Sequence, residues 1–582
     1  MSALFASIIA LTNLCGAVSV DTHGARVVSY VPVGGGEVLA TSAAGDGGVS
    51  PYWPCLADSG SVDGSRRHGI TGCHDFSVVA VTNHAPWDSE IVLRLGSDAG
   101  TKIGFPYDFT LTISVRLTDR LTCTMTGENT GDIPFDVAEA FHAHLVKDNS
   151  VRYEVEGMET SESRIAEAAL TGVRILKPGE QHALTGTIRL SKTYANALPI
   201  DIQPEIDAAS ASGGGRVTVP QGEWLTRSIR LRSNVELHLS DGATLVFRDE
   251  AEACLPVVRT SYSAIEYYGL SPLIYAFGAT NVSITGSGAL APRMALWREW
   301  FLRDTPVVFE SHRILYEWGE NDVPVEKRRF ADPAAARIRP CCVEFERCGN
   351  VRLERFCIRN SPLWCVHLRL CDGALVCDID ITARGHNNDG IDVNASRNVI
   401  IDGCTLEQGD DGVVIKSGRD RDGRRVGVPC ENVEVRNCTI RSGHALLTIG
   451  SEVSGGVRNI FMHGCRVEGN RVGAAICIKT SDRKGAFIEN VCASNITAMG
   501  SIGYVMTLSA NCGLQWERYP AREHILTRID GVRLEDFNVG SVVRVCDVRG
   551  DARNPVKNLS IRNVRVESAR AESHVENAEI SK

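Results

Sequence analysis

The stretch "NVIIDGCTL", from Asn398 to Leu406, decides the fold class of this chain because it recurs along the C-terminal two-thirds of the sequence. Close copies read "NVRLERFCI" from Asn350, "NVEVRNCTI" from Asn432 and "NIFMHGCRV" from Asn459, and weaker copies read "NVCASNITA", "GVRLEDFNV" and "NLSIRNVRV". Each copy alternates apolar and polar residues, is broken by Gly, Asn or Asp, and lacks helical periodicity. The pattern therefore predicts many short β-strands.

The spacing of these copies indicates how the strands are arranged. Asn350, Ala374 and Asn398 lie 24 residues apart or nearly so. A unit of this size cannot bury its own apolar face, so it must stack on its neighbours. Leucine-rich repeats need a Leu/Asn signature that these units lack, and a β-sandwich would need more hairpin turns. We therefore predict an all-β chain, with a right-handed parallel β-helix over residues 199–572 preceded by an N-terminal β-sandwich over residues 1–192.

The composition is that of a soluble globular protein, because 43% of the 582 residues are hydrophobic and 23% are charged. The formal net charge is -10, so the surface as a whole does not attract nucleic acid or anionic lipid. An anionic substrate would therefore need a local basic patch. The sequence has no run close to 18 apolar residues, which argues against a membrane span.

The N-terminus and the cysteines both bear on the compartment. The opening "MSALFASIIALTNLCGAVSV" has an apolar run without a preceding Lys or Arg and without a clean cleavage site, so we interpret it as a first strand. The 20 cysteines are spread along the chain without CxxC pairs, and several lie in strand-like sequence. Buried, reduced thiols and a cytoplasmic location fit this distribution. Zinc-ligand spacings are absent, so we expect no metal and no cofactor.

Acidic residues cluster in two stretches about one coil apart, "GHNNDGIDVN" and "EQGDDGVVIKSG". Asp389 precedes Asp410 by 21 residues and Asp411 by 22. Because stacked coils lie about 4.8 Å apart, all three carboxylates can share one face of the β-helix. Adjacent strand residues point to opposite faces, so the Asp pair must lie at a bend, which Gly409 and Gly412 permit.

Two further residues fall into the same register once loop insertions are subtracted. His444, in "SGHALLTIGSE", lies about one coil beyond the Asp pair, and Lys479, in "AICIKTSDRKG", about one coil further. A single Asp beside Gly is usually a turn residue, and a single His or Lys is often structural or solvated. The shared register of all five residues favours a functional groove. Asp392, on the same strand as Asp389, is interpreted as structural.

At these residues the sequence resembles the polygalacturonases, glycoside hydrolase family twenty-eight. The family's N-x-D, D-D, G-H-G and R-x-K motifs correspond to Asn387–Asp389, Asp410–Asp411, Gly443–Ala445 and Cys477–Lys479. The resemblance spans about residues 200–566. Cys477 replaces the Arg that helps to hold the substrate carboxylate in the family, and a thiol cannot provide a guanidinium fork. Lys479 alone, or Arg residues from the basic loop, would therefore have to hold that carboxylate.

The resemblance implies an inverting glycoside hydrolase that acts on galacturonate-containing pectic oligosaccharides. It implies that Asp410 is the general acid, with a pKa raised by its acidic neighbours, and that Asp389 and Asp411 hold and deprotonate the water. His444 would help to keep the acid protonated or bind the sugar. It further implies that Lys479 pairs with a uronate carboxylate and that Asn387 hydrogen-bonds the substrate.

Two other functions remain open at this point. A polysaccharide lyase on the same fold would use calcium and an Arg or Lys base instead of an acidic ladder. A non-catalytic glycan-binding β-helix would not need Asp410 to be ionisable. The oligomeric state is left open.

Two insertions interrupt the repeats. The stretch "KSGRDRDGRR", from Lys416 to Arg425, is either a solvated loop or a patch that attracts a polyanion. The insertion over residues 293–339 contains Trp297, Trp300 and Trp318, which either stack on sugars or pack beneath a long loop. We hypothesise that this second insertion blocks one end of the groove and imposes exo action.

The N-terminal third resembles the aldose 1-epimerase superfamily, whose fold is a large β-sandwich. The matching pieces include "GGVSPYWPCLADS", "RRHGITG", "AFHAHL" and "ILKPGEQHALTGTIRL", which place His68 and His142 at the positions of that family's active-site histidines. The stretch that carries the family's catalytic acid is missing between "VEGMETSE" and "ALTGVRILKPGE". Without a general base, ring opening has no driver. We expect a scaffold or sugar-binding accessory domain.

Overall fold

The chain divides into two compact units, Met1–Ala195 and Asn196–Lys582, each described here by itself. The computed structural model describes residues 8–13, 16–32, 38–39, 48–53, 70–85, 88–118, 120–137, 139–144, 151–156, 158–160, 165–168, 174–192, 194, 197–300, 306–383, 385, 387–513 and 518–581. No helix among these residues is long and apolar enough to cross a membrane.

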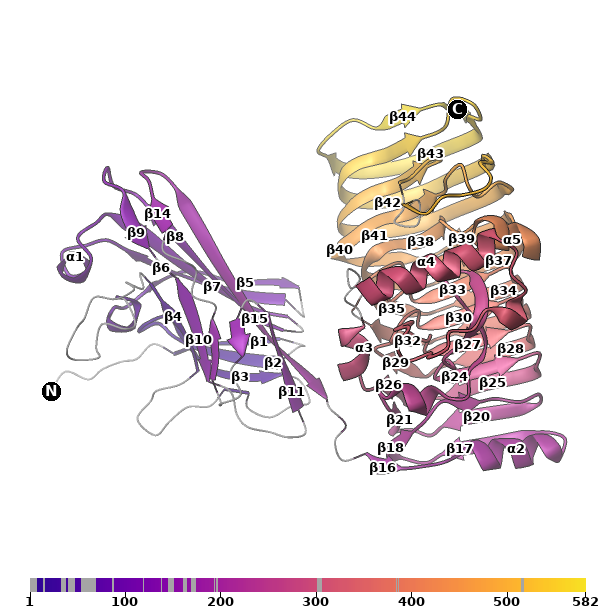
Figure 1. Ribbon diagram of the computed structural model, residues 1–582. Coiled ribbons are helices and arrows are strands. Elements are labelled where there is room, and N and C mark those ends of the chain that lie inside the picture. Colours follow the sequence, from indigo (N-terminus) through magenta and orange to yellow (C-terminus); the bar gives the residue numbers. More distant parts are fainter. Residues whose placement is uncertain are drawn as a thin grey trace. The chain divides into compact units, whose positions relative to one another are not determined.

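The first unit is built from antiparallel β-sheets that alternate buried and exposed residues (Figure 1). One sheet has seven strands, β1 (Ile8–Asn13), β2 (Gly16–Asp21), β3 (Arg26–Pro32), β4 (Val49–Tyr52), β10 (Ala140–His144), β13 (Ile165–Ala168) and β12 (Met158–Thr160). The other has six, β11 (Val151–Glu156), β15 (Gln181–Lys192), β8 (Leu121–Asn129), β7 (Phe109–Leu117), β6 (Asp88–Gly96) and β5 (Ser77–Ala85). One core joins the two sheets, as predicted for a β-sandwich.

Smaller elements complete this unit: β9 (Phe135–Val137) pairs with β14 (Arg174–Leu176), and α1 (Thr101–Gly104) and the 3-10 turn η1 (Thr71–Cys73) connect strands. Of the two histidines singled out by the epimerase resemblance, His68 lies outside the described residues. The backbone of His142 lies in β10, where it pairs with Ser50 and Glu167. The accessory role of the unit stays a prediction.

The second unit is a β-helix of parallel strands, right-handed as predicted (Figure 1). Its first strands are β16 (Leu198–Pro199), β17 (Gly215–Val219), β18 (Gly222–Thr226), β19 (Ile229–Arg230), β20 (Val235–Leu239), β21 (Ala243–Phe247), β24 (Ile274–Phe277), β25 (Thr280–Gly286), β26 (Ala289–Pro292), β27 (Val343–Glu346), β28 (Gly349–Glu354), β29 (Cys357–Arg359), β30 (Val366–Arg369), β31 (Asp372–Cys377) and β32 (Asp380–Ala383). They continue as β33 (Ile391–Asn394), β34 (Arg397–Asp402), β35 (Thr405–Gln408), β36 (Val413–Lys416), β37 (Cys430–Arg436), β38 (Thr439–Gly450), β39 (Val457–His463), β40 (Arg466–Lys479), β41 (Phe487–Ser509), β42 (Arg528–Arg549), β43 (Val556–Ala569), β44 (His574–Glu576) and β45 (Ala578–Ser581). From β24 to β35, each strand pairs with the third strand after it, so three strands make one coil.

The predicted repeat corresponds to one column of this β-helix. The apolar residue that follows each repeat's first position pairs in register from coil to coil and is buried inside, as seen for Val282, Val351, Ala374, Val399, Val433, Ile460, Val491 and Val532. Eleven of the described cysteines of this unit are also buried, and its described cysteines are free thiols. Ile, Val and Cys therefore fill the interior, as the sequence predicts.

The asparagine that opens each repeat has a backbone function. These residues adopt a left-handed conformation with φ between 50° and 59°, which most L residues disfavour but Asn tolerates. Five of these side-chain amides donate to the asparagine one coil earlier, in the pairs Asn281–Asn234, Asn350–Asn281, Asn432–Asn398, Asn459–Asn432 and Asn490–Asn459. Asn398 and Asn558 instead donate to Asp372 and Asp530. The ladder turns the chain at the same corner of every coil.

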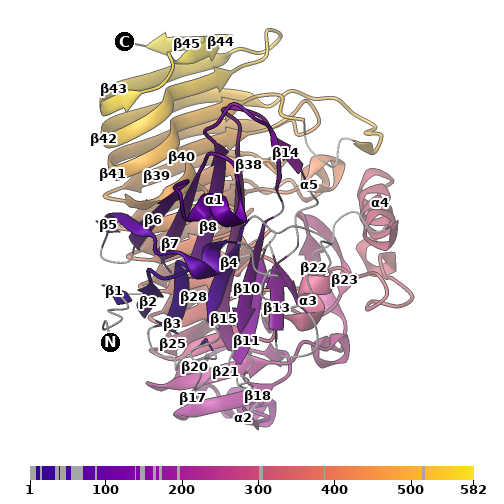
Figure 2. The same ribbon diagram turned by 90° about the vertical axis from the view of Figure 1, so that its left-hand side faces the viewer.

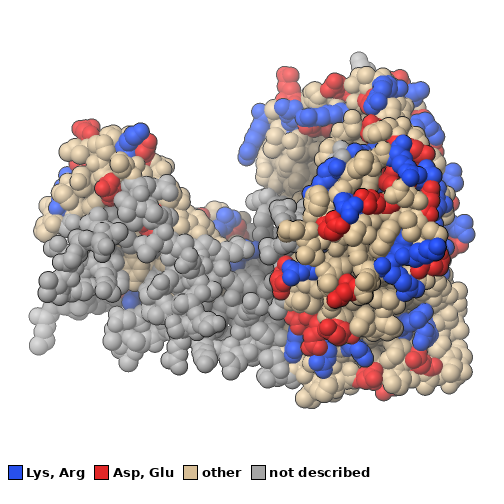
Figure 3. All heavy atoms as spheres, viewed as in Figure 1, with Lys and Arg blue, Asp and Glu red and all other residues tan. Residues whose placement is uncertain are grey.

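The insertions of the β-helix gather on one side of it (Figure 2). They comprise the antiparallel hairpin β22 (Val258–Tyr262) and β23 (Ile265–Gly269), α3 (Ala295–Glu299), α4 (Pro306–Glu320), α5 (Asp420–Val426), and the 3-10 turns η2 (Ala251–Cys254) and η3 (Val325–Lys327). The remaining helix, α2 (Gln203–Ala211), lies at the N-terminal end of the unit, with Ile206 in the core. On the face in Figure 3, side chains of both charges are interspersed over the β-helix.

The tryptophans of the 293–339 insertion do not offer free ring faces for sugar stacking. Trp297 and Trp300 belong to the apolar core of the β-helix and are 0% and 5% exposed. Trp318 packs against a separate cluster beneath the helices, next to Phe330. The sequence offered two interpretations of these tryptophans, sugar stacking and core packing. Core packing applies, because the rings of the insertion pack into apolar clusters.

We expect the asparagine ladder to contribute measurably to stability. Replacing Asn459 by Ala should destabilise the β-helix by about 2–4 kcal/mol, because Ala disfavours the left-handed conformation and two amide hydrogen bonds are lost. Asn459→Gly keeps the conformation and loses only the hydrogen bonds, so it should cost less. Denaturant unfolding followed by circular dichroism measures both. A glycine variant less stable than the alanine variant would contradict this account.

Candidate active site

The Asp pair lies at a bend between β35 and β36, as the sequence predicts. A side chain at Gly409 would place its Cβ 2.2 Å from the Gly385 carbonyl oxygen, so the two coils approach too closely there for any other residue. A Cβ at Gly412 would meet the carbonyl oxygen of Leu446 at 2.9 Å. The two glycines therefore let the backbone turn so that both carboxylates serve the same side of the coil.

Backbone hydrogen bonds fix the order of the site residues on successive coils. The Gly390 amide, next to Asp389, donates to the Asp411 carbonyl at 2.9 Å. The amide of His444 donates to the Asp410 carbonyl at 2.8 Å, and Gly450 pairs in register with Lys479. The predicted ladder of three Asp, one His and one Lys is thus present.

Five of the six predicted site residues line one pocket of about 260 Å³: Asn387, Asp389, Asp410, Asp411 and Lys479. His444 is not part of the lining but contacts Asp410 from the rim, where its side chain is 66% exposed. The rest of the lining comes from residues not assigned to the site from sequence, namely Tyr262, Ser263, Leu363, Trp364, Lys416, Arg419, Ser451, Glu452 and Gly513.

Asp411 is held rigidly at the back of the pocket. Its Oδ1 accepts a hydrogen bond from the Thr448 hydroxyl at 2.7 Å, and its Oδ2 accepts one from Lys479 Nζ at 2.8 Å. Lys479 is part-buried, and although burial alone would lower its pKa, Asp411 and the other nearby acids raise it. The ammonium therefore stays charged beside the pocket.

Asp410 and His444 form an ion pair, with Nδ1 of the imidazole 2.8 Å from Oδ1 of the carboxylate. Burial alone would raise the pKa of Asp410, but the hydrogen bond from His444 and the nearby cations bring that pKa below its usual value. The same hydrogen bond, against partial burial, raises the pKa of His444. The expectation that acidic neighbours raise the pKa of Asp410 is therefore wrong for the ligand-free site, because the imidazolium outweighs them.

Asp389 is in the opposite electrostatic situation. It is 4% exposed, and burial, followed by repulsion from Asp392 and Asp410, raises its pKa well above the usual value. The cation beside it is Lys416, whose Nζ lies 3.7 Å from Oδ2. This lysine and Glu452, 3.1 Å apart, were not identified from the sequence, because a Lys inside "VVIK" and a Glu inside "GSE" have no distinguishing spacing.

The two asparagines of the first motif have different surroundings. Arg339, at the end of the long insertion, donates to Oδ1 of Asn387 at 3.2 Å, and Asn387 borders the pocket. The amide of Asn388 donates to the carbonyls of Ser361 and Leu363, at 2.8 and 2.9 Å, inside the wall. Asn387 is thus placed to contact a substrate, and Asn388 holds the preceding coil in register.

The tip of the β22–β23 hairpin, Tyr262 and Ser263, forms one wall of the pocket. Arg419 ties this tip down, because its Nε donates to the Ser263 carbonyl at 3.0 Å and its guanidinium pairs with Glu452. On the other side, Tyr262 packs against His312 of α4, with ring centroids 5.1 Å apart. The insertion therefore supports the wall without reaching the carboxylates.

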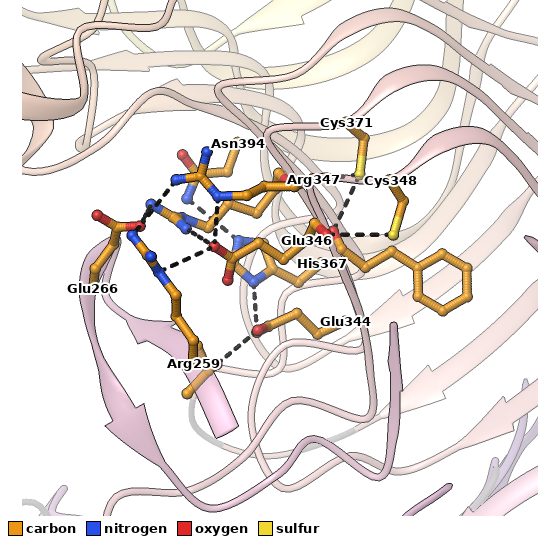
Figure 4. A network of polar contacts seen from close by, with 12 residues as sticks. Arg259, Glu266, Glu344, Glu346, Arg347, Cys348, His367, Cys371 and Asn394 are labelled. Carbon is orange, nitrogen blue, oxygen red and sulfur yellow. Dashed lines mark hydrogen bonds and ion pairs between the residues drawn. The ribbon is translucent and has the colours of Figure 1, made fainter. Parts of the chain in front are cut away.

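A buried ionic network anchors the strands of the same hairpin (Figure 4). Glu266 of β23 accepts from Arg259 at 2.9 Å and pairs with Arg369 at 3.1 Å. Arg369 in turn donates to Glu346 at 2.7 Å. Although burial opposes ionisation, Arg369 and Arg425 keep the pKa of Glu266 well below its usual value. The hairpin is thus fixed to β27 and β30 by charge as well as by packing.

The basic stretch folds into α5 and its flanks, and its charges are largely matched. Arg421 and Arg424 pair with Glu523, at 3.0 and 2.6 Å, and Arg425 pairs with Asp422 at 2.9 Å. Because these guanidinium groups already have acidic partners, the stretch is not a free polyanion-binding patch. Its contribution to the pocket is limited to Lys416 and Arg419.

Cys477, which takes the place of the family's Arg, cannot supply a cation. It pairs in register with Thr448 and Thr507, and burial raises the pKa of its thiol. Lys479 is therefore the cation that remains of the R-x-K motif.

Among the described residues, two groups of side chains bring three potential metal ligands within 4.8 Å of one another: Cys341, Glu344 and His367, and Asp410, Asp411 and His444. In the first group His367 bonds Glu344 at 2.9 Å, and Thr260 donates to Glu344 at 2.7 Å. In the second group Lys479 and the Asp410–His444 pair occupy the same oxygens. Hydrogen bonds and ion pairs account for both groups, so neither is assigned a metal.

Comparison with known proteins bears on the family of the β-helix unit. The model of "Glycosyl hydrolases family 28" matches residues 326–582. A probable polygalacturonase from Vitis vinifera is 26% identical over 380 residues, which cover 63% of this chain and 70% of that protein. A galactose mutarotase-like protein from Lactobacillus casei, 15% identical with a TM-score of 0.26, covers 32% of this chain and all of its own, over the N-terminal region.

A solved exopolygalacturonase from Thermotoga maritima provides a stronger match. It is 35% identical, with a TM-score of 0.61, and the match covers 65% of this chain and 85% of that one. Since the identity extends over most of a relative whose fold this chain shares, the chain belongs to glycosyl hydrolase family 28 and is an O-glycoside hydrolase.

Proposed function

We propose that this hydrolase cleaves galacturonate-containing pectic oligosaccharides with inversion, removing residues from a chain end. The observation that carries the proposal is that Asp389, Asp410 and Asp411 line one pocket together with the ammonium of Lys479. Three carboxylates supply an acid and a base, and the cation supplies a partner for a uronate. Inversion requires acid and base carboxyls about 6.5–9.5 Å apart, a separation that neighbouring coils can offer diagonally.

In this mechanism Asp410 and His444 act together as the general acid. The pair holds one transferable proton, which rests on the imidazole in the ligand-free site because the pKa of His444 is raised and that of Asp410 is lowered. When the leaving oxygen approaches, this proton moves from Nδ1 of His444 to the Asp410 carboxylate and from there to the leaving oxygen, which leaves a neutral imidazole beside an ionised carboxylate. His444 therefore stores the proton and does not itself keep Asp410 protonated.

Asp389 and Asp411 hold the attacking water on the other side of the scissile bond. Asp411 is fixed by Thr448 and Lys479, so it orients the water. The raised pKa of Asp389 brings that carboxylate closer to the working pH, where a general base is most efficient.

End-on cleavage is supported by the shape of the site. The pocket of about 260 Å³ is smaller than the roughly 300–1,000 Å³ of ordinary small-molecule sites, so it accommodates a terminal sugar better than a long chain. The hairpin tip at Tyr262 and Ser263 closes one side. The Thermotoga maritima relative is described as an exopolygalacturonase.

Incubation with a galacturonate oligomer tests the proposal. We expect monomeric or end-derived products from the first minutes, with the inverted anomer seen by NMR. Asp410→Asn should lower kcat by about 100- to 10,000-fold, because the proton donor is removed. Random mid-chain products would contradict exo action, a retained anomer would contradict inversion, and an unsaturated product would indicate a lyase instead.

The uronate contact can be tested at Lys479. Lys479→Met should raise KM for galacturonate oligomers about 10- to 100-fold, since a charged hydrogen bond is worth about 1.5–3 kcal/mol. It should also reduce the preference for the free acid over its methyl ester. Arg421→Met, a cation paired at the surface with Asp322 and Glu523, is the matched control and should leave both values unchanged. An unchanged ester preference in the Lys479 variant would argue against a uronate contact.

The proton store predicts a change in pH dependence. Because the pKa of His444 is raised, the Asp410–His444 pair keeps its proton, and hence activity, to higher pH than a lone Asp would. Activity is lost as pH rises through that pKa, so His444→Gln should move the alkaline limb of the kcat profile to lower pH. Initial rates from pH 4 to 9 measure this. An alkaline limb that stays in place would rule out storage by His444.

A further inference from the structure

We infer that Lys416 is a positioning residue of the hydrolysis: its ammonium holds the Asp389 carboxylate in place and in its ionised form, and it acts through charge within the pocket wall. The inference rests on the proposed function, in which Asp389 is part of the base. Neither the repeat nor any of the family motifs quoted above singles out this lysine.

The placement of Lys416 follows from the register of the coils. It ends β36 and pairs with Asn394 at the end of β33, which in turn pairs with Arg369. The column therefore runs from the guanidinium network in Figure 4, through the neutral Asn394, to the Lys416 ammonium. Asp392 lies on the same strand as Asn394, and Asp389 lies just before that strand.

The ammonium is surrounded by carboxylates. Lys416 Nζ lies 3.1 Å from Glu452 Oε2 and 3.6 Å from Asp392 Oδ1. Its distance to Asp389 Oδ2 is 3.7 Å. The side chain is 5% exposed, and the ammonium lies 4.9 Å from the ring centroid of Trp364, which forms part of the wall. Because solvent screens a buried charge only weakly, the ammonium acts mainly on the neighbouring carboxylates.

Of these three carboxylates, the two aspartates depend most on Lys416. Glu452 also pairs with the guanidinium of Arg419. Neither carboxylate oxygen of Asp392 has a hydrogen-bond partner among the described residues, and both are buried. Burial raises the pKa of both aspartates. Repulsion from Asp392 and Asp410 adds to this shift at Asp389, and repulsion from Glu452 and Asp411 adds to it at Asp392, whereas Lys416 opposes both shifts. Without this cation, Asp389 would stay protonated to higher pH and could not accept a proton from water.

Other charged groups near Lys416 do not replace it. Lys479 is bonded to Asp411, and Arg419 to Glu452 and the Ser263 carbonyl. Asp410 is paired with His444. Lys416 opposes the repulsion of Asp389 by Asp392 and Asp410. Because Lys416 and Asp392 carry opposite charges beside Asp389, they make a natural pair of opposite variants.

Three near-isosteric variants test the inference: Lys416→Met, Asp392→Asn and the double variant. Base catalysis fails as pH falls through the pKa of Asp389. Loss of the neighbouring cation raises that pKa, so Lys416→Met should move the acidic limb of kcat upward by about one pH unit or more. Loss of the neighbouring anion lowers it, so Asp392→Asn should move the same limb downward. The double variant removes both charges and should return the limb towards the wild-type position.

The inference predicts that kcat changes while KM for a galacturonate oligomer stays within about threefold, because the lysine acts on Asp389 and not on the sugar. Thermal melting checks folding. If Lys416→Met does not fold, the double variant and Asp392→Asn carry the test, since both remove the buried Asp392 carboxylate, whose charge Lys416 offsets. The outcomes separate the two claims. A wild-type protein without hydrolytic activity overturns the proposed function. An active wild type whose acidic limb is unmoved in these variants, or whose Lys416 variant changes only KM, overturns the role of Lys416.

Discussion

The parallel pairing of successive coils is the constraint on which the rest of this protein depends. Strands pair about 4.8 Å apart, so each residue lies directly beside its counterpart one coil earlier. Val351, Ala374 and Val399 stay in one buried column, and the asparagines at the neighbouring corner stay in another. The same register brings Asp389 beside Asp411, although 22 residues separate them along the chain.

The stacked carboxylates repel one another, and cations on separate coils offset this repulsion. Asp410 has His444, Asp411 has Lys479, and Asp389 shares Lys416 with its neighbours. The cations do not offset the repulsion equally at each carboxylate. Asp410 is near enough to an imidazole for its pKa to fall, whereas Asp389 is buried beside a second carboxylate and its pKa rises. The difference provides one proton store and one base within a single pocket.

The helical insertions give the groove its walls. A regular β-helix would present an open trough, but α4 supports the β22–β23 hairpin and a buried ionic network ties that hairpin to β27 and β30. Trp297 and Trp300 fill the core below and leave the pocket polar. The wall residues thus come from segments far apart in sequence, and the site depends on the insertion for shape and on the coils for chemistry.

The sequence alone determined the β-helix, the order of its coils and the five ladder residues, because period-24 repeats and fixed register make distance along the chain a measure of distance in space. It also identified the bend at Asp410 and Asp411, since only glycine fits at Gly409. Tertiary structure alone decided the charge states and the walls. The pKa of Asp410 depends on an imidazole 34 residues away in sequence, Lys416 gains its role only from buried acids on other coils, and Arg339, at the end of an insertion, donates to Asn387. The charge states and the walls depend on distances between side chains and on their burial. No local sequence pattern encodes those distances or that burial.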